Sequence, residues 1–181
     1  MNKLLNLDKN KILRIIIISI IFLFLMLAFQ WHVGKNVKAK LENLLLENKY
    51  VESVEVTEQR EEVIIYLTLK NIDNLMEAYN RISNTMKERL KGQPFELKII
   101  NKTDSELEDI FNREVQFIIY EALKTGEFTE MRARLDEIEN TVTENSTSGP
   151  LKIQVYLDSD NLYLHIQLNE SNFYKVIKRE V

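Results

Sequence analysis

The chain has 181 residues, a formal net charge of −4 and no cysteine. This length suits one ordinary domain or two small modules. The absence of cysteine excludes disulfides, thiol chemistry and cysteine-ligated zinc. The acidic balance argues against nucleic acid as a partner, because phosphates bind basic surfaces.

An apolar segment near the N-terminus predicts a transmembrane helix. The run Ile15–Phe29 has Ser19 as its single polar residue, and its apolar flanks extend the segment to Ile12–Val33. A helix of this length would cross the ~30 Å core of a bilayer. No A-x-A cleavage pattern follows, which favours an uncleaved anchor over a signal peptide. The basic residues before the segment predict a short cytoplasmic tail at 1–11 and an extracytoplasmic domain. We therefore expect a single-pass cell-membrane protein that contacts the lipid bilayer through residues 12–33.

Residues 35–102 are predicted to form a first α+β module. Hydrophobic periodicity gives a helix, a hairpin of two strands, a helix that begins at Asp73 and a third strand. The second strand is apolar on both faces, which predicts a central position in the sheet. The first helix is expected at 35–48, the two strands of the hairpin at 51–58 and 63–69, and the third strand at 95–100.

The α-β-β-α-β order of this module resembles that of the ring-building modules of secretion and sporulation machines, which assemble into membrane-associated rings. The resemblance covers Lys35–Ile100 and consists of element order, without a fixed Gly or Trp motif. Element order is shared by many small α/β domains, so no family is assigned from it.

Residues 103–181 are predicted to form a second α+β module. A helix begins at Thr103 or Asp104 and is interrupted by Gly126, and another begins near Phe128. A clean apolar alternation then predicts a hairpin of strands 151–157 and 162–168. The tail 169–181 is predicted as either a short helix or a final strand. The fold class is thus α+β: one N-terminal transmembrane helix, the α-β-β-α-β module, and a helix-helix-β-hairpin unit.

The polar side of the last hairpin carries Tyr156, Tyr163 and His165. Aromatic side chains on a sheet face are typical of a partner surface or of a face covered by a second helix layer, and they also occur as plain cross-strand pairs. A proton-linked switch is the functional interpretation of His165 and of His32. We favour the simpler interpretation that both rings are solvated or interfacial.

The sequence contains no motif that predicts catalysis. G-x-S-x-G, G-x-G-x-x-G and P-loop patterns are absent. The acidic groups near residues 104–109 and 136–139 are candidate metal ligands, but the first group fits a helix N-terminus and the second a solvated helix face. Asp158 and Asp160 supply too few oxygens for a calcium site. We therefore expect no enzyme activity, no cofactor and no metal.

These observations favour a protein that acts by binding or assembly in the cell envelope, with another envelope protein or with itself as the partner. Confinement would raise the effective concentration of such partners. Two alternatives remain: an accessory ligand-sensing domain of a membrane complex, and an envelope enzyme with an unrecognised carboxylate site.

Overall fold

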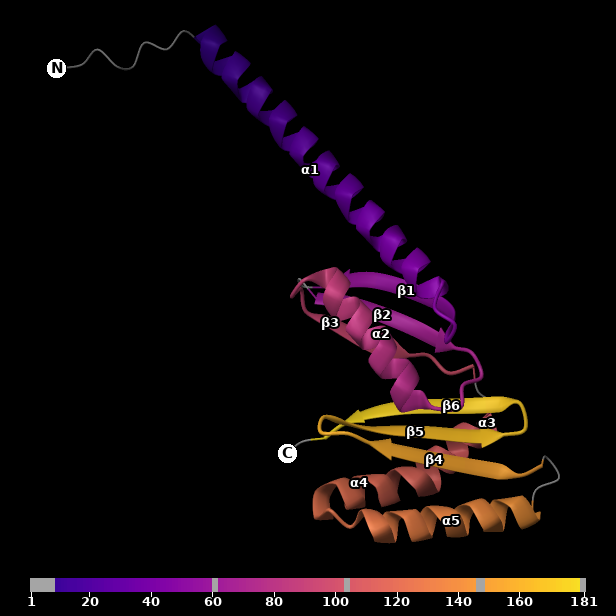
Figure 1. The fold of residues 1–181 in the computed structure, drawn as a ribbon. Coiled ribbons are helices and arrows are strands. Elements are labelled where there is room, and N and C mark those ends of the chain that lie inside the picture. The colour runs from indigo at the N-terminus through magenta and orange to yellow at the C-terminus, as the bar shows by residue number, and fades with distance from the viewer. Residues whose placement is uncertain (1–8, 60–61, 103–104, 146–148, 180–181) are drawn as a thin grey trace. The chain divides into compact units, whose positions relative to one another are not determined.

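The computed structural model describes residues 9–59, 62–102, 105–145 and 149–179. It is a mixed α+β fold with five α-helices, one π-helical turn and two three-stranded sheets (Figure 1). The chain divides into two compact units, one that ends at Asn43 and one that begins at Leu44. Both sheets belong to the second unit.

Helix α1 (Lys9–Leu46) contains the apolar segment. Its described side chains over Ile12–Leu27 are exposed and include Arg14. In the described part of the chain, no helix combines the length and the apolar character that crossing a membrane requires.

The predicted transmembrane helix at 12–33 is therefore unsupported. The predicted localisation as a single-pass cell-membrane protein with an extracytoplasmic domain is wrong, because it depended on this helix. Residues 1–8 of the predicted cytoplasmic tail lie outside the described residues.

Sheet A consists of β1 (Val51–Gln59), β2 (Glu62–Leu69) and β3 (Phe95–Ile99), in the order β1-β2-β3. Strands β1 and β2 form an antiparallel hairpin, whereas β2 and β3 run parallel. The predicted hairpin and the predicted central position of β2 are confirmed. Turn residues 60–61 lie outside the described residues.

Helix α2 (Leu75–Leu90) connects β2 to β3 and lies across one face of sheet A (Figure 1). Asn74, one residue after the predicted Asp73, caps the helix because its Oδ1 accepts a hydrogen bond from the Glu77 amide at 3.0 Å. The helix ends where Lys91 takes a left-handed conformation. Its buried stripe comprises Leu75, Ala78, Ile82, Met86 and Leu90.

Sheet B is an antiparallel meander of β4 (Leu151–Leu157), β5 (Asn161–Leu168) and β6 (Ser171–Lys178). The predicted hairpin is confirmed, with Leu164 opposite Val155 and Tyr163 opposite Tyr156. The tail, for which the sequence left helix and strand open, forms strand β6. Sheet B, which belongs to the predicted second module, therefore has a third strand.

One face of sheet B packs against the helices that precede it. These are α3 (Ser105–Ile110), the π-helical turn η1 (Phe111–Val115), α4 (Gln116–Thr125) and α5 (Phe128–Asn145). Gly126 ends α4 with φ +81°, a left-handed conformation that glycine adopts freely. The predicted starting residues Thr103 and Asp104 lie outside the described residues. The core on this face includes Leu107, Val115, Ile119, Leu135, Ile153, Leu162, Leu164 and Ile166.

Candidate functional site

The other face of sheet B is covered by α2. Tyr163 and His165 are 0% and 2% exposed, and Tyr156 is half-buried. The Tyr163 hydroxyl lies 3.1 Å from Asn80 Oδ1 on α2, and the Tyr79 ring meets the Tyr163 ring edge-on at 5.6 Å. Two of the three side chains predicted as a partner surface thus lie inside the unit, and α2 is the helix layer above them.

The Tyr163 hydroxyl joins the β4–β5 turn to this buried layer. It donates to Asp158 Oδ2 at 2.6 Å and accepts from Asn161 Nδ2 at 3.2 Å. Burial and the hydrogen bond to Asp158 raise the pKa of Tyr163 well above its usual value. The phenol therefore stays protonated and acts as a structural donor.

Asp158 shapes the turn itself. Its Oδ1 accepts hydrogen bonds from the amides of Asp160 and Asn161 at 2.9 and 2.8 Å. Burial is the largest influence on the pKa of Asp158 and works to raise it. Donors from Tyr163 and from the two amides outweigh burial, so the pKa is lowered.

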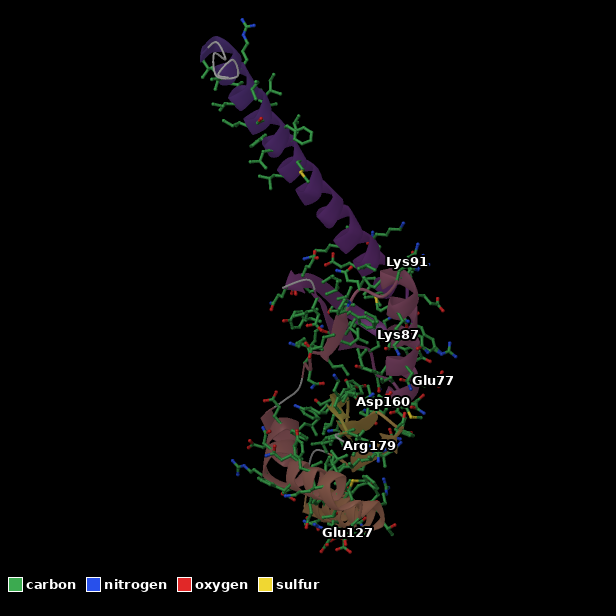
Figure 2. All side chains as sticks on the ribbon, turned by 90° about the vertical axis from the view of Figure 1, so that its left-hand side faces the viewer. Glu77, Lys87, Lys91, Glu127, Asp160 and Arg179 are labelled. Atoms are coloured by element: carbon green, nitrogen blue, oxygen red, sulfur yellow. The ribbon has the colours of Figure 1, made fainter. Side chains whose placement is uncertain are left out.

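The same turn is also held by Arg179, which follows β6 and lies beside Asp160. The Arg179 amide donates to Asp160 O at 2.8 Å, and its guanidinium donates to Asp158 O at 2.6 Å. Figure 2 labels Asp160 and Arg179 on sheet B. The Asp158 carboxylate is therefore engaged in holding the hairpin. Among the described residues, no cluster of three His, Cys, Asp or Glu side chains is arranged to hold a metal ion.

His165 has polar partners on both ring nitrogens. Nε2 lies 2.8 Å from Asn172 Oδ1, and Nδ1 lies 3.1 Å from Gln154 Oε1. Burial lowers the pKa of His165, and nearby Lys152 acts in the same direction, while the Asn172 hydrogen bond and Asp73 act against them. The sequence interpretation of a solvated ring is therefore replaced by that of a buried, neutral one.

Because the imidazole of His165 is neutral, one of its nitrogens donates a hydrogen bond and the other accepts one. Asn172 donates through Nδ2 to Glu170 O at 3.0 Å, so its Oδ1 faces the ring and Nε2 must donate. Nδ1 then accepts, and Gln154 must turn its carboxamide to present the NH₂ group. Protonation of His165 would favour the opposite orientation, with Gln154 Oε1 toward the ring.

Tyr174 of β6 connects the two sheets. Its hydroxyl accepts from the Ile72 amide and donates to Lys70 O, both at 3.2 Å. Its main chain pairs with the side chain of Asn101, the second residue after β3: the Tyr174 amide donates to Asn101 Oδ1 at 2.8 Å, and Asn101 Nδ2 donates to Tyr174 O at 3.0 Å. The carboxamide of Asn101 thus takes the place of a neighbouring strand's peptide group.

A cleft of about 560 Å³ opens beside this Asn101–Tyr174 pair. Strands β3 and β6 contribute two sides, and α3 and η1 contribute a third through Glu108, Phe111 and Asn112. The volume lies in the range of ordinary ligand sites. A π-helical turn at the wall is consistent with a functional site, because such turns concentrate at them. A smaller cavity of about 260 Å³ also has Asn101 and Tyr174 in its lining.

Both strands that border the cleft are the edge strands of their sheets. Tyr174 directs its amide and carbonyl away from β5, so the alternation of an antiparallel pair directs those of Val176 away as well. On β3, the Pro94 carbonyl and the Ile100 amide bond to β2, which leaves the main-chain groups of Leu97 and Ile99 on the outer side. Within the described residues, the outward-facing amides of Leu97, Ile99 and Val176 have no hydrogen-bond partner.

In comparisons with known proteins, no family model, no curated protein and no solved structure matches the chain.

Sequence reasoning missed the cleft. Asn101 is the first of a run of polar residues that follows a strand, a position that no pattern distinguishes. The alternation of Phe173, Lys175 and Ile177 pointed toward a final strand but gave no sign of which edge would stay open. The parallel pairing of β3 with β2 was also needed, because it makes β3 an edge strand.

Proposed function

We propose that this chain is a non-catalytic protein-binding module and that it binds its partner in the cleft between β3 and β6. The observation that carries the proposal is the cleft itself, where two edge strands present unpaired main-chain groups to one space. Strand edges of this kind are used for recognition of other chains.

The chemistry of the lining supports binding over catalysis. The titratable side chains there are Glu96, Lys98, Glu108 and Lys175, together with Tyr174, whose hydroxyl is occupied by the main chain of residues 70 and 72. Glu96 and Lys98 form an ion pair at 3.0 Å. Neither of the buried polar groups His165 and Tyr163 lines the cleft, so neither is placed to act on a molecule bound there.

Site-specific photocrosslinking in the full chain tests this proposal. A photoreactive phenylalanine analogue replaces exposed Asn112 at the cleft, and in a matched control it replaces exposed Glu137 on α5. We expect a protein adduct from position 112 in the native host and none from position 137. An adduct of twice the chain mass would identify a second copy as the partner. Equal labelling at both positions, or no adduct at position 112, would contradict the proposal.

A further inference from the structure

We propose that the occupant of the cleft is an extended peptide segment of a partner protein, added as a strand to the outer edge of β6. This inference rests on the proposed function and specifies how the partner is recognised. The added strand would lie between β6 and β3 and would draw its main-chain hydrogen bonds from Val176 and from the outer side of Leu97 and Ile99.

The Asn101–Tyr174 pair shows that the β6 edge accepts an amide in strand geometry. The Asn101 side chain offers one carbonyl and one N–H group, as a peptide unit does, and both reach the main chain of Tyr174 at 2.8 and 3.0 Å. Side-chain mimicry ends there, because the next outward-facing residue, Val176, has no partner among the described residues. A partner segment would continue the ladder that Asn101 begins.

The size of the edges sets the length of the segment. Strand β3 has five residues and β6 has eight. At ~3.3 Å per residue, an added strand of about five residues would follow the whole of β3. Such a segment is short enough to come from a loop or a terminus of the partner.

The lining indicates an uncharged segment with alternating apolar side chains. The carboxylates of Glu96 and Glu108 balance the ammonium groups of Lys98 and Lys175, which disfavours a polyanion or a polycation. Apolar contacts come from Phe111 and Phe173 on one side, whose rings stack at 4.8 Å, and from Leu97, Ile99 and Val176 on the other. Successive side chains of an extended peptide point to opposite sides, so both walls would be contacted.

Two substitutions at one position separate main-chain recognition from other binding modes. Val176→Pro removes the outward N–H, and proline is tolerated on an edge strand where the lost donor faces away from the sheet. Val176→Thr keeps the N–H and the β-branched shape, and it serves as the matched control. Linear dodecapeptides selected from a random library on the full wild-type chain are the probe.

We expect the selected peptides to bind wild type and Val176→Thr within about threefold of each other, and Val176→Pro at least tenfold more weakly. Circular dichroism establishes that each variant is folded. In wild type, amide exchange supplies a second measurement: bound peptide should slow exchange at Val176, Leu97 and Ile99.

Three outcomes would overturn strand addition: no peptide is enriched, the proline variant binds as tightly as wild type, or protection appears elsewhere in the chain. If crosslinking from position 112 succeeds while any of these occurs, the cleft binds a protein by another mode. If crosslinking from position 112 itself fails, the proposed function falls with it.

Discussion

The buried imidazole of His165 should make the stability of this protein fall as the pH drops below neutrality. The ring is 2% exposed, and its burial lowers the pKa of His165 below the ordinary value of about 6.5. The unfolded chain therefore takes up a proton near pH 6.5, whereas the folded chain does not. Stability is fully present above that pH and is lost as the pH falls through it.

The size of the effect follows from this difference in proton uptake. Proton uptake by an unfolded imidazole with a pKa of about 6.5 sets an upper limit of about 1.9 kcal/mol on the fall in the free energy of unfolding between pH 7 and pH 5. Any protonation of the folded ring within this range reduces the loss. Asp158, whose pKa is lowered in the fold, contributes in a separate window, because its stabilisation is lost only near and below about pH 4.

Urea unfolding of the full chain at pH 7, 6 and 5 measures this loss. His165→Gln is the matched variant, because it keeps hydrogen-bonding groups toward Gln154 and Asn172 and removes the titration. His32 is retained in both proteins, so its contribution cancels in the comparison. We expect the wild type to lose more stability than the variant over this range. Equal losses, or a wild type that gains stability as the pH falls, would refute the reasoning.

Three further substitutions test the packing. Tyr163→Phe should lower the free energy of unfolding by about 1.5 kcal/mol through loss of the 2.6 Å hydrogen bond to Asp158; urea melts measure it, and a loss below about 0.3 kcal/mol would contradict the assigned bond. Leu164→Ala should cost about 2–5 kcal/mol by opening a cavity in a fully buried site, whereas exposed Lys152→Ala should stay within about 0.5 kcal/mol in the same assay. Lys91→Gly should raise the thermal midpoint, because glycine relieves the left-handed φ of +49° by about 0.5–1 kcal/mol; a lowered midpoint would show that the lysine side chain contributes more.

Sequence patterns predicted the local elements of this fold well. The β4–β5 hairpin follows from strict alternation of apolar residues, and the central position of β2 follows from its apolar residues on both faces. The tail was ambiguous because Phe173 and Ile177 fit both a strand and one helix face. These successes concern residues close together in the chain, where periodicity carries the information.

Contacts between distant segments were not predictable in the same way. Tyr163 and His165 lie on a strand with a regular pattern of apolar residues. This local pattern cannot predict that α2, some 80 residues earlier in the chain, covers them. The Asn101–Tyr174 pair joins positions 73 residues apart. The cleft depends on that pair and on which strand edges remain open, so it became visible only in the folded chain.

The contacts of Tyr174 have a consequence for the order in which the chain folds during synthesis. Lys70 and Ile72 leave the ribosome about a hundred residues before Tyr174, the side chain that hydrogen-bonds their main-chain groups. Until β6 has been made, the Ile72 amide lacks this partner, and α2 has no sheet B beneath it. The hydrogen bonds that Tyr174 makes to the connection between β2 and α2 can therefore form only after the last strand has been synthesised.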